Sequence, residues 1–146
     1  MKLSTRGRFG LRVLVELAVR QDQGPIMMEH LNACVGGSRK YLYNLLTTLK
    51  HAGLVRAVRG AGGGYTLARR PEQISVHEVV RSLEEDSSPV DCQAGGRRCG
   101  QLDTCATREV WLELDQTVER VLSAIRLSEL AERQQRKCAE PPMFHI

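Results

Sequence analysis

Residues 54–68 constrain the fold more than any other stretch of this 146-residue chain. Residues 54–59 alternate in the manner of a β-strand, and residues 65–68 form a second short strand-like run. Between them, residues 60–64 read Gly-Ala-Gly-Gly-Gly, and glycine permits the positive φ values of a tight turn. A nucleotide-binding loop also contains such glycines, but no Lys-Ser or Lys-Thr pair follows and no helix begins there. The sequence therefore predicts a β-hairpin with a glycine-rich tip.

Three predicted helices precede this hairpin. Residues 5–20 carry apolar side chains at helical spacing. Residues 27–33 predict a short helix and residues 39–51 a further one, with a glycine turn between them and Ser38 as the N-cap of the latter. Two helices joined by a small-residue turn and followed by a hairpin are typical of a winged helix-turn-helix, whose second helix enters the major groove of DNA.

The candidate DNA contacts follow from this plan. Basic and amide side chains near the start of helix 39–51 suit base edges, and Arg59 stands at the hairpin tip, where it suits a minor groove or a phosphate. Arg8 shares part of one face of the first helix with Arg6 and Arg12, which suits phosphates or simply water. The predicted DNA-binding set is Arg8, Ser38, Arg39, Lys40, Tyr41, Tyr43, Arg59, Gly60 and Gly62.

The charge distribution supports a polyanionic partner. Residues 1–70 hold 12 Lys and Arg against 3 Asp and Glu, whereas residues 71–146 hold 9 against 14. A basic first half joined to an acidic second half indicates a polyanion-binding part attached to a control part. The alternative is a solvated basic face that has no partner.

The second half contains a cysteine-rich segment that follows a predicted helix at residues 75–85. Cys92, Cys99 and Cys105 lie within 14 residues, among glycines and arginines that bury little apolar surface. Thiolates at this density can bind a metal ion or an iron–sulfur cluster, whose bonds would order the segment. A disulfide-tied or reduced loop is the alternative. The N-terminus lacks the apolar core of a secretory signal, which predicts a cytoplasmic protein with reduced thiols, and the five cysteines are an odd number.

Residues 104–124 form the longest periodic segment. Its apolar residues are spaced 3, 4, 3 and 4 residues apart, as in a two-heptad seam. Such a seam is too long for the small preceding domain to cover, so it predicts pairing with the same helix of a second subunit; an intramolecular packing helix is the alternative. The predicted dimerisation residues are Trp111, Leu114, Val118, Val121 and Ile125.

The predicted fold is mainly α, with a small β-hairpin wing and a long C-terminal dimerisation helix. Its expected parts are a DNA-binding domain at 1–86, a cluster-binding loop at 87–103, the dimerisation helix with a short following helix at 104–137, and a mobile tail at 138–146. The chain turns polar from Gln134 onward. No apolar run approaches the length of a membrane span.

An enzyme with a cysteine nucleophile is not expected. Such an enzyme needs a histidine base, and the four histidines stand in sequence contexts without a paired acid: His30, His51, His77 and His145. Cys34 is interpreted as a small, partly buried residue and Cys138 as incidental.

Several strings resemble the Rrf-two family of winged-helix transcriptional regulators, of the IscR, NsrR and RirA type. They are residues 1–9 (MKLSTRGRF), 40–42 (KYL), 53–55 (GLV) and 58–68 (VRGAGGGYTLA), together with the three-cysteine loop. The resemblance implies a homodimeric regulator, of repressor type, on a palindromic double-stranded operator. It also implies one 2Fe–2S or 4Fe–4S cluster per subunit, held by Cys92, Cys99 and Cys105, whose state responds to redox conditions, nitric oxide or iron supply.

The chain departs from the family pattern at the fourth cluster ligand. Family members place a histidine where this chain has Arg108, or an acidic residue where it has Arg8, and arginine does not ligate iron. Glu109, Asp91, a group of the partner subunit, a small thiol or water are the remaining candidates. Tyr43 stands where related proteins carry an acid used for base discrimination, so operator preference does not carry over. A cluster-free regulator of the same fold, responding through oxidation of Cys34, Cys99 or Cys138 or through a partner protein, is the alternative.

Overall fold

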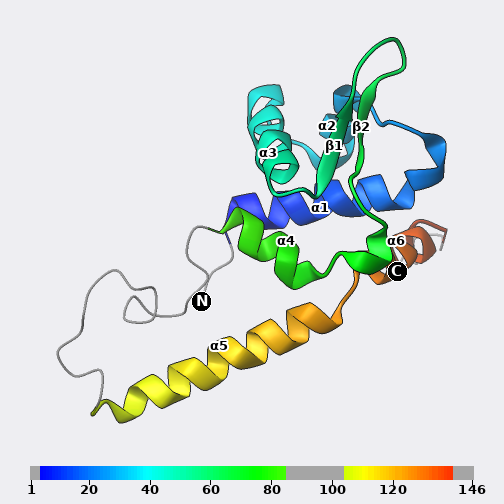
Figure 1. The fold of residues 1–146 in the computed structure, drawn as a ribbon. Helices are drawn as coiled ribbons and strands as arrows, with labels where there is room; N and C mark the ends of the chain where they lie inside the picture. The colour runs from blue at the N-terminus through cyan, green and yellow to red at the C-terminus, as the bar shows by residue number, and fades with distance from the viewer. Residues whose placement is uncertain (1–3, 85–103, 140–146) are drawn as a thin grey trace, which may run out of the picture.

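The computed structural model describes residues 4–84 and 104–139 (Figure 1). The helices in chain order are α1 (Thr5–Val19), α2 (Met28–Val35), α3 (Arg39–His51), α4 (Val76–Leu83), α5 (Ala106–Ala124) and α6 (Leu127–Ala139). The strands are β1 (Val55–Val58) and β2 (Gly64–Leu67), and short 3-10 turns lie at η1 (Gln21–Gln23) and η2 (Pro71–Gln73). The expected fold class is confirmed: the described chain is mostly helical, with one two-stranded antiparallel sheet.

Helices α1, α2, α3, α4 and α6 share one apolar core. Its most buried residues come from all of these helices and from the segments between them: Val13, Leu14, Leu31, Leu42, Leu46, Leu49, Leu54, Ile74, Val79 and Leu127. Leu127 and Ala131 of α6 pack in this core, where α6 contacts α1. Helix α6 therefore completes the winged body, whereas the sequence grouped it with the dimerisation helix.

Strand β2 of the hairpin is hydrogen-bonded along both of its edges. Strands β1 and β2 pair in register from Val55 opposite Leu67 to Val58 opposite Gly64. The free edge of β2 is taken by Ile26, which exchanges two 2.9 Å backbone hydrogen bonds with Tyr65. A Cβ atom at Gly64 would lie 2.4 Å from the Ile26 carbonyl oxygen, so only glycine allows this close approach.

Helices α1 and α4 also approach closely because of glycines. A Cβ atom at Gly10 would lie 2.1 Å from Leu83 Cδ1, and one at Gly7 would lie 2.3 Å from Glu84 Oε1. Glu84 in turn accepts hydrogen bonds from the backbone N–H and the hydroxyl of Ser4, at 3.1 and 2.7 Å. The end of α4 is thereby tied to the start of α1.

Helix α5 extends away from this body (Figure 1). None of its residues is buried, and its main contacts are with α4. A short backbone bridge fixes its C-terminal end: Val76 N–H donates to the Ile125 carbonyl at 3.0 Å, and Leu127 N–H donates to the Ile74 carbonyl at 2.9 Å. Apart from α4, the described residues offer the rest of the helix few contacts.

The observed elements differ from the predicted ones mainly at their ends. Helix α3 has the predicted bounds, and most other boundaries differ by one or two residues. The mobile tail expected at residues 138–146 is wrong for residues 138 and 139, because α6 continues to Ala139 and includes Cys138. Of the helices described here, none is both long and apolar enough to cross a membrane.

Candidate nucleic-acid interface

The start of α3 has the geometry expected of a recognition helix. The Ser38 hydroxyl accepts the Tyr41 N–H at 3.2 Å and so caps the helix. Lys40 is exposed beside it, and the Arg39 guanidinium pairs with Glu29 of α2 at 2.6 Å. Both partners of this pair are well exposed, so it is weak, and a DNA phosphate can replace the carboxylate at little cost.

The two predicted tyrosine contacts are placed differently. Tyr41 turns back toward α1, where its ring meets Phe9 edge-on with centroids 5.8 Å apart. Its hydroxyl is buried and has no hydrogen-bond partner among the described residues. Tyr43, in contrast, is 55% exposed. Tyr43 is therefore the tyrosine of α3 that is presented to an approaching ligand.

The wing tip presents Arg59 on a backbone that needs glycine. Gly60 and Gly62 have φ values of 103° and 77°, in the region that side-chain-bearing residues rarely adopt. A Cβ atom at Gly63 would lie 2.4 Å from the Val58 carbonyl oxygen. Arg59 is exposed and forms no hydrogen bond or ion pair within residues 4–84 and 104–139. Its charge is available to a phosphate.

The arginines at the start of α1 do not share one role. Arg6 donates a 2.7 Å hydrogen bond to the Thr48 hydroxyl and so ties α1 to α3. Arg8 is exposed and makes only a long 3.4 Å contact to the Thr5 hydroxyl. Of these two, Arg8 is the one whose charge faces solvent, and its contact with DNA stays a prediction, as do those of α3 and the wing.

Of the three predicted cluster ligands, Cys92 and Cys99 lie outside the described residues. Cys105 is the N-cap of α5, and its Sγ lies 3.1 Å from the Thr107 hydroxyl oxygen. Hydrogen bonds from the Thr107 side chain and the Arg108 backbone N–H hold the pKa of this thiol below its ordinary value. This shift raises the share of the thiolate form, which is the form that binds metals.

The described residues near Cys105 include one acid among the candidate fourth ligands. Glu109 is exposed in the first turn of α5, four residues from Cys105. Arg108, at the position of the family's histidine, is half-buried, and its Nε has no hydrogen-bond partner among the described residues. Asp91 lies outside the described residues, so the fourth ligand stays open.

The predicted dimer seam is largely exposed in the single chain. Trp111, Leu114 and Val121 are 38%, 36% and 53% exposed, while Val118 and Ile125 are half-buried. Ile125 is the C-cap of α5 rather than a helical residue. Among the described residues, this row of apolar side chains is left partly exposed, which is typical of a surface that binds a partner.

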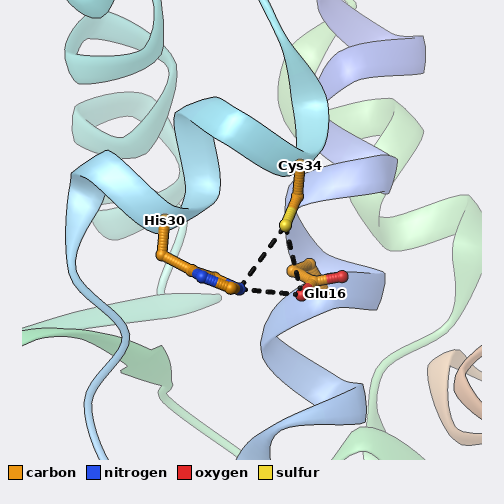
Figure 2. A group of neighbouring side chains, drawn as sticks. All are labelled: Glu16, His30 and Cys34. Atoms are coloured by element: carbon orange, nitrogen blue, oxygen red, sulfur yellow. Dashed lines mark hydrogen bonds and ion pairs between the residues drawn. The ribbon is translucent and has the colours of Figure 1, made fainter.

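The structure also assembles a cluster that the sequence did not reveal. The side chains of Glu16, His30 and Cys34 meet between α1 and α2 (Figure 2). His30 Nε2 lies 3.3 Å from Glu16 Oε1, so the expectation that no histidine has a paired acid is wrong. Cys34 is exposed rather than partly buried. The i, i+4 spacing of His30 and Cys34 was a visible signal, but Glu16 joins them only through the packing of the helices.

Comparisons with known proteins agree with this architecture. The family model of Rrf2, described as an iron-dependent transcriptional regulator, matches residues 3–133. Protein rrf2 of Nitratidesulfovibrio vulgaris is 37% identical over 130 residues, covering 89% of this chain and 87% of that protein. The structure of CymR, the global cysteine regulator of B. subtilis, superposes with a TM-score of 0.78 at 34% identity, covering 91% and 98% of the two chains.

A second solved structure, IscR of T. potens, superposes with a TM-score of 0.77 at 33% identity and covers 99% of this chain and 97% of its own. The matching family model and the CymR structure are both described as regulators, which agrees with the winged-helix fold and with the expectation that the chain is not an enzyme. The chain belongs to the Rrf2 family of DNA-binding transcriptional regulators.

Proposed function

We propose that this regulator acts as a homodimer on a double-stranded operator, as a repressor, and that an iron–sulfur cluster in residues 92–105 sets its affinity for DNA. The observation that carries the proposal is the position of Cys105. Cys105 is the N-cap residue of the helix that bears the exposed apolar seam, so a group bound to its thiol is connected directly to the proposed dimer helix.

The chemistry of Cys105 fits a cluster ligand. Iron is bound by thiolates, and the start of α5 stabilises the negative sulfur through hydrogen bonds from Thr107 and Arg108. Cys92, Cys99 and Cys105 would hold the cluster, and when bound it would supply iron–thiolate bonds that oxidants and nitric oxide attack. An incomplete set of protein ligands, with arginines at both positions where the family places the fourth, suits such sensitivity.

The proposed dimer follows from the apolar seam of α5. Among the described residues, Trp111, Leu114 and Val121 keep 38%, 36% and 53% of their surface exposed. Two copies of α5 packed through this seam would bury it and would place two winged bodies side by side, as a palindromic operator requires. Because Cys105 begins α5, losing the cluster would alter the support of that helix and hence the spacing of the two recognition helices.

The cluster is tested by anaerobic purification followed by visible absorption and by assay of iron and acid-labile sulfide. Wild-type protein should be coloured, and Cys105→Ser and Cys99→Ala should each lose the cluster. Cys138→Ser is the matched control, because it also removes a thiol but lies in the last turn of α6, outside the proposed ligand set. Colourless wild-type protein, or unchanged absorbance after exposure to air and to nitric oxide, would argue against a sensing cluster.

The link to DNA is tested with an operator selected from a random duplex pool. Affinity for this duplex should change when the cluster is removed, and the change should be absent in the Cys105→Ser variant. Equal affinity of the intact and the cluster-free protein would contradict gating while leaving DNA binding itself in place.

The wing assignment has its own test. Arg59→Ala should weaken binding and should lower the salt dependence of the affinity by about one phosphate contact. Arg81→Ala is the matched control, because Arg81 is also exposed but lies on α4, away from the wing. Unchanged affinity and slope for Arg59→Ala would remove the wing from the interface.

A second candidate function is regulation through the thiols without a cluster. The lowered pKa of Cys105 favours the reactive thiolate, and one structural relative is named as a cysteine regulator. In that case the anaerobic protein is colourless, and mild peroxide changes DNA affinity in the wild type but not in Cys105→Ser.

A further inference from the structure

We propose that Glu16, His30 and Cys34 form a binding site for one zinc-type divalent cation, separate from the cysteines of residues 92–105. The donors come from two helices: Glu16 from α1, and His30 and Cys34 from successive turns of α2 (Figure 2). A carboxylate oxygen, an imidazole nitrogen and a thiolate sulfur are the ligand atoms that Zn²⁺ takes in proteins.

The distances between the donor atoms fit a tetrahedral ion. With bonds of about 2.0–2.1 Å to nitrogen or oxygen and about 2.3 Å to sulfur, two tetrahedral ligands stand roughly 3.3 Å apart for N and O and roughly 3.5 Å apart when one is sulfur. Glu16 Oε1 lies 3.3 Å from His30 Nε2, Cys34 Sγ lies 3.4 Å from His30 Nε2, and Cys34 Sγ lies 3.5 Å from Glu16 Oε1. The three donors thus already form one face of the coordination tetrahedron.

The same geometry does not fit a catalytic triad. In a triad, the histidine contacts the nucleophile through one ring nitrogen and the acid through the other. Here the Cys34 sulfur and the Glu16 oxygen both approach Nε2. Burial, followed by the charge of Glu16, also raises the pKa of the Cys34 thiol, which is the reverse of what an activated nucleophile needs. Three donor atoms that all lie close to one another, as these do, are typical of a metal-binding site.

The charges of the site match a divalent ion. The Glu16 carboxylate and the Cys34 thiolate carry two negative charges, and the neutral His30 ring adds a lone pair. Binding releases one proton, from the Cys34 thiol, to solvent. Without an ion, Glu16 is satisfied by the Arg20 guanidinium, which pairs with it one turn along α1. This contact is made to Oε1, the same oxygen that faces His30 and Cys34, so binding of an ion requires Arg20 to move to the second carboxylate oxygen, from which it can orient the ligand.

The fourth position is left to solvent. A hollow of about 400 Å³ opens beside Glu16 and Cys34, between α1, α2 and α6. Leu11, Leu130 and Gln134 line it together with nearby arginines, and none of the lining residues brings a further acid, histidine or cysteine to the ion. A water molecule therefore completes the tetrahedron.

An ion at this site would fix the position of the recognition helix α3. Cys34 precedes the last residue of α2, and the turn at Gly36 leads directly into α3. A bond network from α1 to the end of α2 fixes the helix pair that presents α3 to DNA. Occupancy therefore stabilises the winged body itself, independently of the dimer helix and of any cluster.

The experiment uses Co²⁺ as a spectroscopic probe on the full-length chain with Cys92, Cys99 and Cys105 replaced by serine. This background should bind one Co²⁺ per subunit, with tetrahedral visible bands and a thiolate-to-cobalt charge-transfer band. Zn²⁺ should displace the Co²⁺ and raise the melting temperature. Adding Cys34→Ser should abolish the charge-transfer band. Glu16→Gln and His30→Gln should each weaken affinity more than about 100-fold, beyond the effect of losing an outer partner.

Two matched controls keep the result specific. Cys138→Ser removes the other described cysteine that is exposed, and His51→Gln removes an exposed histidine of α3; both should leave Co²⁺ binding unchanged. In the wild-type background, Cys34→Ser should lower the number of bound Co²⁺ ions by one per subunit while the loop cysteines are intact. Absence of the charge-transfer band from the triple variant, or its persistence after Cys34→Ser, would overturn the site, and neither result depends on whether the loop holds a cluster.

Discussion

The winged body and helix α5 show opposite ways in which one periodic pattern can be used. Both α3 and α5 carry apolar residues at helical spacing, yet α3 buries four leucines completely while α5 buries no residue. The difference lies in what packs against each helix, because α3 is packed against α1, α2, α4 and β1 whereas α5 mainly contacts α4. The apolar row of this 19-residue helix is therefore only partly covered by the described residues, which is the surface that the proposed dimer would bury.

The largest expected effect is a loss of stability when a core residue of α3 is shortened. Leu46 is fully buried in α3, so Leu46→Ala should lower the free energy of unfolding by about 2–5 kcal/mol through lost burial and a residual cavity. Leu114→Ala in α5 is the matched control, because the same side chain is 36% exposed there in the single chain. Urea denaturation of dilute protein measures both, and equal losses would break the contrast between the two helices.

The next effect concerns the seam of α5. Trp111→Ala should weaken the proposed homodimer by about 2 kcal/mol or more, roughly 30-fold in its dissociation constant, because buried tryptophans dominate interfaces. Sedimentation velocity over a range of concentrations measures this change. Gln116→Ala, an exposed change on the same helix outside the seam, should leave the dimer intact, and a Trp111→Ala variant that dimerises as well as wild type would place the interface elsewhere.

A smaller effect is expected where α1 meets α4. Gly10→Ala places a Cβ atom against Leu83, whose side chain is buried, and the resulting overpacking should cost about 1–3 kcal/mol despite alanine's better helix propensity. Thermal unfolding of the variant measures the loss. A gain in stability would mean that α4 can shift away from α1 freely.

The helix caps give a matched pair of still smaller effects. Ser38→Ala and Ser75→Ala each remove a 3.2 Å hydrogen bond at a helix N-terminus and should each cost about 1 kcal/mol of stability. Only Ser38→Ala should also weaken binding to the operator, because Ser38 begins the recognition helix. DNA affinity reduced equally by both variants would trace the effect to stability alone.

The smallest effect is the pH dependence contributed by Glu16. Burial raises the pKa of this carboxyl, but hydrogen bonds from Arg20 and His30 outweigh it, and the pKa lies below its ordinary value of 4.5. A lowered folded-state pKa stabilises the fold above pH 4.5, and this contribution is lost as the pH falls below that value. Glu16→Gln should therefore flatten the acid limb of a plot of unfolding free energy against pH, and an unchanged limb would contradict the pairing.

Local patterns determined much of this protein. The glycine string of residues 60–64 specifies a tight hairpin tip, since Gly60 and Gly62 adopt positive φ, and Ser38 caps the helix that the leucine spacing defines. Periodicity likewise located α5 and its apolar row. These features depend on steric and hydrogen-bonding rules that act over a few residues, which is why the sequence alone reveals them.

Tertiary packing decided the rest. The sequence did not show that α6 returns to cover α1, because the few apolar residues of α6 resemble those of a marginal helix until Leu127 and Ala131 are seen in the core. Nor did it show that Tyr41 faces Phe9 while Tyr43 faces solvent. Glu16 and Cys34 are 18 residues apart in the chain, and only the contact of α1 with α2 brings them within 3.5 Å. Residues that belong to different helices become neighbours through burial of apolar surface, and no local rule encodes that proximity.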